Sequence, residues 1–319
     1  MTISLIFFAS PDIALPSFEK LINSPDFEVK ALVTQPPKPA KRGKKIQDSN
    51  VKKLAMSHGI DVLEPARIAK EPDMIEKLKS YNVDFFVTFA FGQILSAEVL
   101  AIPKFQTINL HASLLPKYRG ANPICAALLS GDLVTGITTM VTVLELDAGD
   151  ICLTEEISGV DKMDFPLLSR EIAEKSPDLI MKTLHGLYNG SLKPLPQNAD
   201  EATFTCKLKK EDKELDFKNP VKALHNKVRA LCEINTCHFL YNSKIIKVLK
   251  TDFCENSDFG VCKNFKPGEV ISVEKQGITV KCGDNAILIK TVKPEGKPEM
   301  PAYAWSLGSK IKSGDVLGC

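Results

Sequence analysis

Three side chains suited to hydrogen bonding or proton transfer stand near the ends of two predicted strands. Asn109 and His111 flank Leu110 in FQTINLHA (105–112). Because successive strand residues alternate between faces, the amide and the imidazole should project from the same face. Asp147 stands in a turn farther along the chain. The amide and a protonated imidazole can donate hydrogen bonds to an oxygen that becomes anionic, and a carboxylate can stabilise the imidazolium. We therefore predict that these residues form a catalytic site.

The turn that carries Asp147 has the sequence LELDAGDI (144–151), with Asp147 and Asp150 on either side of Gly149. It follows an alternating strand pattern, so its carboxylate can reach the rim occupied by the amide and the imidazole. Ligands of open α/β sheets gather beyond the carboxyl ends of strands, and the chain leaves this rim through SLLPKYRG (113–120). The structural alternative is a hydrogen-bonded strand end and an acidic turn that caps its own backbone.

Other chemistries have little support in the sequence. Nine cysteines form an odd set without a C-x2-C pair, and the five histidines include no H-E-x-x-H motif, so we predict no disulfide framework and no metal. The first predicted strand leads into ASPDIA (9–14) instead of G-x-G-x-x-G, which argues against a dinucleotide oxidoreductase. The N-terminal MTISLIFFASP lacks a basic segment and a span long enough for a bilayer, which favours a cytoplasmic protein without a membrane partner.

Short apolar runs alternate with helical patterns over the first part of the chain, as in parallel strands joined by crossover helices. The predicted strands are ISLIFF (3–8), VKALVT (29–34), DFFVTFAF (84–91), FQTINLHA (105–112) and GITTMVTV (136–143). The predicted helices cover residues 16–22, 51–59, 121–131 and 165–187. We expect an α/β fold with an open, mostly parallel sheet whose strand ends present the three polar side chains.

The chain has 319 residues, more than one domain usually contains. Residues 189–203 are rich in Pro, Asn, Gly and acidic side chains, a composition that is typical of a linker. We predict one domain over 1–190, a linker over 191–206 and a second domain over 207–319.

The second predicted domain is β-rich. A helical pattern over 220–231 precedes apolar runs at 239–250, 268–282 and 285–293, which are separated by Gly, Asn and Asp. Short strands at regular spacing favour a small barrel or sandwich.

Basic residues are unevenly distributed. Residues 207–319 carry 20 Lys and Arg against 14 Asp and Glu, whereas the preceding residues carry 21 against 25. A proline-broken basic loop, TQPPKPAKRGKKI (34–46), stands apart from any predicted element. These features favour a polyanionic partner, and a solvated Lys-rich surface is the alternative.

The stretch NLHASLLPKYRGANPI (109–124), followed by GDLVTGITTMVTVLELDAGDI (131–151), resembles the signature of the folate-dependent formyltransferases. Three more stretches resemble the methionyl-tRNA branch of that superfamily: the basic loop 34–46, VKKLAMSHGIDVLEP (51–65) and FAFGQIL (89–95). Looser matches follow in the same order at 207–217, 228–234, 267–271 and 292–308, so the resemblance covers nearly the whole chain. It implies a Rossmann-like domain followed by a smaller OB-fold-like β-barrel domain that binds tRNA.

The resemblance also implies site residues. The catalytic trio of the family falls on Asn109, His111 and Asp147. The implied folate-binding residues are Ser113, Leu114, Leu115, Pro116, Phe89, Phe91, Gly92 and Ile94, with the main chain of 144–147 helping to enclose the pterin ring. The implied tRNA-binding residues are Arg42, Lys41, Lys44 and Lys45, with Arg42 reaching the acceptor end.

The implied reaction moves a formyl group from 10-formyltetrahydrofolate to the amine of methionine on initiator tRNA, without a metal. The formyl oxygen becomes anionic when the uncharged amine attacks. Asn109 and a protonated His111 would donate to this oxygen. Asp147 would stabilise the imidazolium and help, through water, to take a proton from the amine. The implied partners are initiator Met-tRNA and folate, and we expect a monomer because no association helix stands out.

Three positions depart from the family pattern. Ala9, Ser10 and Pro11 stand where Gly-Thr-Pro is usual, and Ser10 keeps the hydroxyl. Phe91 replaces a Tyr, which removes one phenolic hydrogen bond. CEINTC (232–237) replaces an aromatic-and-proline pattern.

Two alternative functions remain open. A formyltransferase could act on a ribonucleotide or an amino-sugar amine, but the additional β-rich domain and the basic loop argue against this. A tRNA-binding module without catalysis would explain the basic second domain, but the intact trio argues against it.

Overall fold

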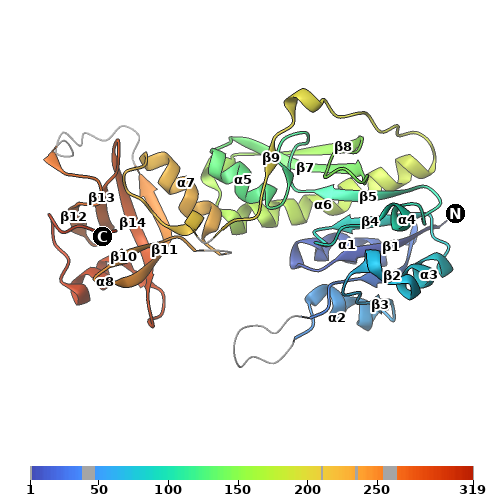
Figure 1. Cartoon of the computed structure of the whole chain (residues 1–319), viewed down its shortest axis with the longest axis horizontal. Coiled ribbons are helices and arrows are strands. Elements are labelled where there is room, and N and C mark those ends of the chain that lie inside the picture. Colours follow the sequence, from blue (N-terminus) through green and yellow to red (C-terminus); the bar gives the residue numbers. More distant parts are fainter. Residues whose placement is uncertain (1, 38–46, 210, 234–235, 254–263, 319) are drawn as a thin grey trace. The chain divides into compact units, whose positions relative to one another are not determined.

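The computed structural model describes residues 2–37, 47–209, 211–233, 236–253 and 264–318 (Figure 1). The chain forms two compact units, each assembled from segments that are distant in the sequence. Unit 1 comprises Met1–Pro123, Val134–Ser158 and Ser169–Thr205, and unit 2 comprises Ile124–Leu133, Gly159–Leu168 and Cys206–Cys319.

Unit 1 is built on a seven-stranded sheet with the order β3-β2-β1-β4-β5-β7-β8 (Figure 1). Its strands are β1 (Ile3–Ala9), β2 (Phe27–Val33), β3 (Asp61–Leu63), β4 (Phe85–Phe89), β5 (Gln106–His111), β7 (Val134–Val141) and β8 (Ile151–Ser158). The first five are parallel, whereas β7 runs antiparallel to β5 and β8 runs antiparallel to β7. The predicted Rossmann-like, mostly parallel sheet is confirmed, and β3 and β8 are additions that the sequence patterns did not predict.

Helices cover both faces of this sheet. Ile6 and Phe8 of β1 join an apolar cluster with Phe86 of β4 and Leu78 of α3 (Pro72–Ser80). The side chain between them, Phe7, packs instead on Phe18 of α1 (Leu15–Asn23), with ring centroids 5.2 Å apart. Burial on both faces explains why β1 and β4 are continuous apolar runs without polar alternation.

Helix α6 (Phe165–Tyr188) fixes the strand that leads to the acidic turn. Its Thr183 hydroxyl lies 2.8 Å from the hydroxyl of Thr139 on β7, and its Ser176 hydroxyl lies 2.8 Å from that of Ser17 on α1. All four side chains are buried, so each hydroxyl satisfies the other in place of water.

The remaining elements of unit 1 are short. They include α2 (Asn50–Ser57), α4 (Ala97–Leu100), β6 (Arg119–Gly120) and β9 (Phe204–Thr205). β9 pairs in parallel with β6, and Leu195 forms an antiparallel bridge with Ile151. The predicted linker 191–206 is therefore hydrogen-bonded to unit 1 at Leu195 and at β9, and β9 lies beside the end of the stretch SLLPKYRG. The domain boundaries placed from the sequence stay a prediction.

Unit 2 contains an antiparallel sheet with the order β10-β11-β14-β13-β12, and β15 (Met300–Pro301) pairs with β14. Its strands are β10 (His238–Tyr241), β11 (Lys244–Phe253), β12 (Val270–Glu274), β13 (Gly277–Lys281) and β14 (Ala286–Pro294), and its helices include α7 (Val221–Leu231) and α8 (Ala302–Ser309). The predicted β-rich second part is confirmed. The single run predicted at 239–250 is a hairpin, because Asn242 and Ser243 both have positive φ and close a two-residue turn.

The buried Arg229 of α7 explains why unit 2 includes segments from earlier in the chain. Its guanidinium donates to the carbonyl oxygens of Val160 at 2.6 Å, Met163 at 2.8 Å and Leu128 at 3.1 Å, and to Asn226 Oδ1 at 2.9 Å. Leu128 lies in α5 (Pro123–Ser130). A buried guanidinium needs such acceptors, so the 124–133 and 159–168 segments are bound to α7.

Three buried cysteines are unreactive. Cys125, Cys152 and Cys237 are buried, and burial raises the pKa of each thiol to about 12, which makes them inert fillers.

Several other sequence predictions concern absences or fall outside the described residues. Within the described ranges, no helix combines the length and apolar character that crossing a membrane requires. No three His, Cys, Asp or Glu side chains of these same residues gather as metal ligands. The predicted tRNA-binding Lys41, Arg42, Lys44 and Lys45 lie outside the described residues, as do Ile234 and Asn235 of CEINTC.

Candidate active site

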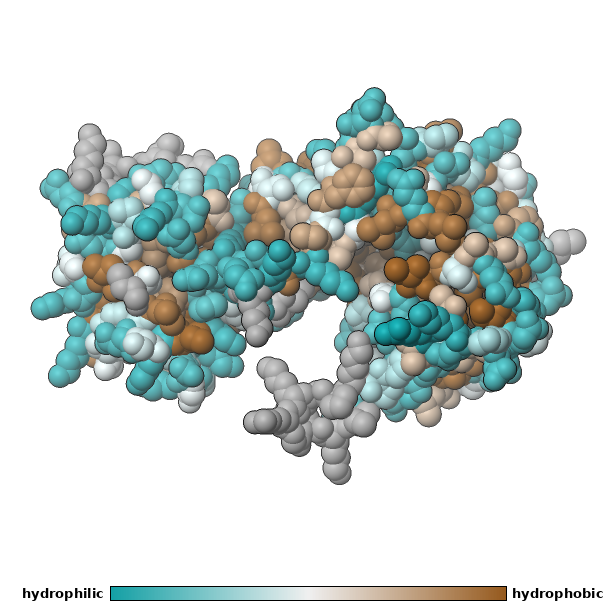
Figure 2. All heavy atoms as spheres, in the orientation of Figure 1, coloured by the Kyte–Doolittle hydropathy of each residue, from teal (hydrophilic) through white to brown (hydrophobic). Residues whose placement is uncertain are grey.

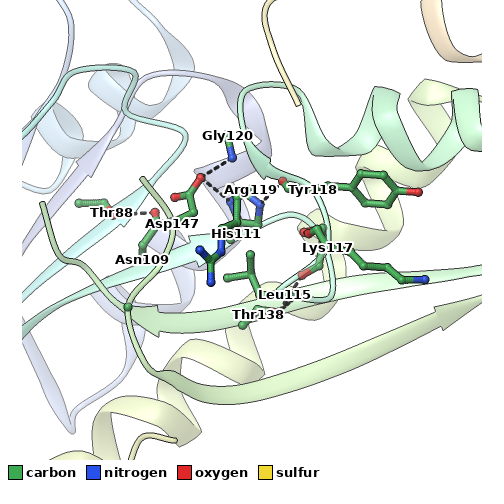
Figure 3. Close-up of polar contacts among 12 residues, drawn as sticks. Thr88, Asn109, His111, Leu115, Lys117, Tyr118, Arg119, Gly120, Thr138 and Asp147 are labelled. Atoms are coloured by element: carbon green, nitrogen blue, oxygen red, sulfur yellow. Dashed lines mark hydrogen bonds and ion pairs between the residues drawn. The ribbon is translucent and has the colours of Figure 1, made fainter. Parts of the chain in front are cut away.

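Asn109 lies at the carboxyl end of β5, opposite Thr88 of the neighbouring strand β4. The Thr88 hydroxyl donates to Asn109 Oδ1 at 2.7 Å (Figure 3). This bond orients the amide, because the oxygen is engaged by β4 and the Nδ2 group points elsewhere. Asn109 can therefore present its N–H groups to a ligand beyond the strand ends.

His111 is 6% exposed, and each of its ring nitrogens has a different neighbour. Nε2 lies 2.9 Å from the carbonyl oxygen of Tyr118, and Nδ1 lies 3.6 Å from Asp147 Oδ2 (Figure 3). A carbonyl oxygen only accepts hydrogen bonds, so Nε2 keeps its proton in both charge states. The nitrogen that gains and loses a proton is therefore Nδ1, which faces Asp147.

Burial lowers the pKa of His111, and the negative charge of Asp147 and the bond to Tyr118 counteract this effect in part. The resting imidazole is therefore neutral at pH 7 and has a lone pair on Nδ1. The sequence analysis assigned a protonated His111 as a donor to the formyl oxygen. The burial of the ring, which the sequence does not show, favours the neutral form before the reaction begins. His111 is placed to accept a proton before it donates one.

The lowered pKa of His111 predicts a pH dependence that can be measured. His111 should titrate with a midpoint below its ordinary value of about 6.5, and Asp147→Asn should lower that midpoint further. The unfolded chain binds a proton at His111 at a higher pH than the folded protein does. The contribution of the neutral His111 to stability is therefore lost as the pH falls below about 6.5. An NMR titration of labelled histidine, assigned with His111→Ala, measures the midpoint. A value above 6.5 would contradict the assignment of Nδ1 as a resting base.

Asp147 adopts a left-handed backbone conformation with φ of 49°. For a residue with a Cβ this costs about 1–2 kcal/mol, so surrounding contacts must hold it. Its Oδ2 accepts a hydrogen bond from the main-chain N–H of Gly120 at 2.7 Å and is directed toward His111 (Figure 3). The structure thus brings Asp147 to the rim that carries Asn109 and His111.

Residues 118–120 hold two members of this trio through their main chain. The Tyr118 carbonyl binds His111, and the Gly120 N–H binds Asp147. Tyr118 has φ of 61° and Gly120 has φ of 106°. A Cβ at Gly120 would meet the Thr205 carbonyl oxygen at 2.4 Å, so glycine is required for the pairing of β6 with β9.

Replacement of Gly120 by Ala should reduce kcat by about 10- to 100-fold, because the clash with Thr205 displaces the N–H that holds Asp147. Steady-state kinetics and a thermal melt measure the two effects. Gly190→Ala is the matched control, since Gly190 also has positive φ but a Cβ there meets no atom within 4 Å. Wild-type kcat in Gly120→Ala would show that this N–H does not position the carboxylate.

The SLLP stretch that was predicted to bind folate is anchored to β7. Thr138 Oγ1 donates to the Ser113 carbonyl at 2.7 Å and accepts from the Leu115 N–H at 3.1 Å. The Ser113 side chain is fully buried and donates to the Lys117 carbonyl, and Leu115 precedes a cis peptide bond to Pro116. Leu114 and Pro116 are partly exposed, so these two offer the most accessible side chains of the stretch.

The FAFGQIL loop has a buried and an exposed part. Phe89 and Phe91 are 1% and 3% exposed, and the Phe91 ring packs edge-on against Phe8 at 5.5 Å. Their rings belong to the core, so only their main-chain atoms can reach a ligand. A ring without a hydroxyl suits this apolar position. Gly92 has φ of 77°, and Ile94 is 85% exposed.

The Ser10 hydroxyl accepts hydrogen bonds from Thr34 Oγ1 at 3.2 Å and from the Gln35 N–H at 3.0 Å. It therefore connects the ends of β1 and β2. Ser10 can make these bonds in place of the threonine that is usual in the family, because it keeps the hydroxyl.

Large apolar side chains are exposed beside the polar trio. Leu144 and Leu146, which precede Asp147, are 68% and 60% exposed, and Phe204 of β9 is 69% exposed. Figure 2 shows apolar residues reaching the surface of this unit in several places. Exposed apolar groups beside convergent polar groups are typical of a ligand site.

The sequence patterns did not identify Thr88, Tyr118, Gly120 or Gln197 as parts of the site. Gln197 belongs to the predicted linker, yet its side chain contacts the Asp147 turn. Such contacts join residues up to 50 positions apart, and no local spacing reports them. Of these four residues, only Gly120 could have been found from the sequence, because it ends the Pro- and Gly-containing loop that follows a predicted strand.

Known proteins that are similar in sequence indicate the family of this chain. The Formyl transferase family profile matches residues 5–184, and the profile of the formyl transferase C-terminal domain matches residues 207–310. The chain is 40% identical to the methionyl-tRNA formyltransferase of Clostridium botulinum (strain Alaska E43 / Type E3) and 38% identical to that of Clostridium perfringens (strain 13 / Type A). Each alignment covers 98% of this chain and 99% of the relative.

A solved structure, HypX from Aquifex aeolicus in complex with tetrahydrofolic acid, is similar in fold. The TM-score is 0.61 at 17% identity, over 95% of this chain and 46% of HypX. This likeness supports the fold, and the sequence relatives, aligned over nearly their full length, confirm the resemblance noted in the motifs. The chain belongs to the methionyl-tRNA formyltransferase family.

Proposed function

We propose that this protein transfers the formyl group of 10-formyltetrahydrofolate to the amino group of methionine carried by initiator tRNA. The observation that carries the proposal is the pair of His111 Nδ1 and Asp147 Oδ2, 3.6 Å apart beyond the end of β5. A buried base beside a carboxylate can remove the proton that the attacking amine must lose. The full-length relatives named for this activity support the same reaction.

Asn109 acts on the oxygen of the transferred group. Its oxygen is held by Thr88, so its N–H groups can donate to the formyl oxygen as that oxygen becomes anionic. In enzymes of other classes, one such donor is worth about 2.7–4 kcal/mol of transition-state stabilisation.

His111 moves a proton from the attacking nitrogen to the leaving nitrogen. Nδ1 accepts the proton that the amine loses as the new C–N bond forms, and the negative charge of Asp147 stabilises the resulting imidazolium. The imidazolium then donates this proton to the folate nitrogen as its bond to the formyl carbon breaks. The imidazole is neutral again at the end.

The residues proposed for substrate binding divide into two groups. Folate would contact the exposed Ile94, the Leu114 and Pro116 side chains and the main chain of 144–147. The accessible Leu144 and Leu146 offer apolar surface that suits a flat ring. The tRNA would contact the basic residues Lys41, Arg42, Lys44 and Lys45, whose charge suits a phosphate backbone.

Replacement of Arg42 by Ala should raise the KM for tRNA and weaken its dependence on salt, with little effect on the KM for folate. A lost phosphate contact reduces the slope of log K against log salt by about 0.7–0.9. Kinetics at several salt concentrations measure this, with the exposed Lys20→Ala of α1 as a charge-matched control. An unaltered KM for tRNA in Arg42→Ala would count against the docking role.

The reaction itself can be tested by supplying labelled 10-formyltetrahydrofolate with three acceptors. We expect rapid transfer to Met-tRNA, and much slower transfer to the same tRNA carrying another amino acid or to a small amine such as an amino sugar. Preferential transfer to the small amine would overturn the tRNA assignment. Absence of transfer to any acceptor would overturn the proposed function.

The protein is further proposed to work as a cytoplasmic monomer. One chain supplies all three residues of the trio, so catalysis needs no second copy. Bacteria, the source of the similar relatives, make and use charged tRNA, the proposed substrate, in the cytoplasm. Light scattering during size-exclusion chromatography should give a mass near 35.1 kDa, and twice that mass would contradict the monomer.

A further inference from the structure

Gln197 clamps the main chain on both sides of the Asp147 turn. Its Nε2 donates to the carbonyl oxygen of Asp147 at 2.9 Å and to that of Gly149 at 2.7 Å. Both N–H bonds of the amide are thus used on one turn of three residues. Gln197 itself comes from the segment that returns along unit 1 between Leu195 and β9.

Arg119 holds the other end of this amide. Its Nε donates to Gln197 Oε1 at 3.0 Å, so the orientation of the amide is set from both ends. Arg119 is 4% exposed. Its guanidinium lies 6.0 Å from the centroid of the Phe204 ring, and Nη1 lies 3.8 Å from a carboxylate oxygen of Glu145. A buried charge of this kind is kept in place by its acceptors.

The main chain of the Asp147 turn needs contacts with other residues to hold its conformation. Asp147 holds a left-handed backbone, which a residue with a Cβ adopts only when its surroundings impose it. The Gly120 N–H holds the carboxylate, but it does not hold the main chain that carries it. The two carbonyls that Gln197 binds belong to that main chain.

We propose that Gln197 and Arg119 are positioning residues for formyl transfer, which hold the Asp147 turn so that the carboxylate faces His111 Nδ1. This inference rests on the proposed function, because it assigns these residues to the same site. Neither residue acts on the reacting atoms. Both act through Asp147, whose charge reaches His111 only while the turn keeps its geometry.

Replacement of Gln197 by Ala tests the proposal. The variant retains the main-chain pairing of β6 with β9 and should fold. We expect kcat to fall by about 10- to 100-fold with little change in the KM for either substrate, because the loss concerns alignment and not binding. Gln197→Glu should behave like the alanine variant, since it keeps an acceptor for Arg119 but has no N–H for the two carbonyls.

Asn198→Ala is the matched control. Among the residues that the structure describes, this neighbouring amide bonds locally, accepting from the Asp200 N–H and donating to Glu201. It should keep wild-type kcat. Arg119→Lys provides a second check, since lysine keeps the charge but lacks the Nε–H that donates to Gln197 Oε1, and it should reduce kcat in the same direction.

The decisive readout is the pKa of His111 measured by NMR. Asp147 raises this pKa against the effect of burial, so a displaced Asp147 leaves the imidazole with a lower pKa. In Gln197→Ala the midpoint should lie between that of the wild type and that of Asp147→Asn. A wild-type midpoint together with wild-type kcat, or a lowered melting temperature alone, would overturn the positioning role. Failure of the proposed function is distinct, since the wild-type enzyme itself would then transfer no formyl group.

Discussion

Asp147→Asn should lower kcat for formyl transfer by about 100- to 10,000-fold while folate binding stays almost unchanged. Asparagine has the same shape and keeps an oxygen that can accept from the Gly120 N–H, so the turn should survive. What is lost is the negative charge 3.6 Å from His111 Nδ1, which stabilises the imidazolium while the proton is in transit. Single-turnover kinetics and calorimetric titration with folate measure the two quantities.

Asp150→Asn is the control for this variant. Asp150 is an exposed acidic residue of the same turn, and its replacement should leave kcat unchanged. Near-normal turnover in Asp147→Asn would remove this carboxylate from the mechanism. Equal losses in both variants would show that the turn requires overall negative charge and not one placed carboxylate.

His111→Ala should cause a loss of similar size, because it removes the group that carries the proton between the two nitrogens. The loss should appear in kcat, and the KM for tRNA should change little, since the ring is buried at the rim and contacts Tyr118 and Asp147. Rescue by added imidazole at about millimolar to molar concentration would support a proton-transfer role. Full activity without rescue would contradict it.

His111→Ala can also lose activity through local collapse of the structure, because the alanine leaves space in a buried site. His111→Gln separates the two effects. Glutamine can donate to the Tyr118 carbonyl and fill most of the space, but it cannot accept and return a proton near neutral pH. We expect it to fold well and to remain inactive, and a restored kcat would show that the histidine is a scaffold.

The part of the site that depends on strand alternation could be predicted from the sequence. Asn109 and His111 lie two positions apart at the end of a parallel strand, and this spacing is enough to place them on one face at the rim where ligands gather. The continuous apolar runs of β1 and β4 likewise predicted a sheet that is buried on both faces.

The part of the site that is formed by segments from distant positions in the sequence could not be predicted. Gln197 stands in a stretch whose composition is typical of a linker, yet it binds the turn of Asp147 from 50 positions away. The hairpin at Asn242 and Ser243 was missed for a different reason, since two strands of similar composition merge into one apolar run when the turn has no glycine. The neutral state of His111 depends on burial, which emerges only from packing.

Phe91 departs from the family pattern but suits its surroundings in the structure. The family resemblance implies a phenol at this position of a folate loop, whereas the Phe91 ring packs against Phe8 in the core. A hydroxyl would need a partner in this apolar cluster, so phenylalanine suits the local environment better. The position therefore contributes stability to the loop that carries the exposed Ile94.

A double-mutant cycle on His111 and Asp147 is the most direct measurement of the claim that they act as one proton-transfer unit. The rates of formyl transfer to Met-tRNA would be compared for His111→Ala, Asp147→Asn and the double variant. Once the imidazole is gone, the carboxylate has no imidazolium to stabilise, so the double variant should be about as slow as the slower single variant. Losses that multiply in the double variant would show that the two side chains act independently and would contradict the claim.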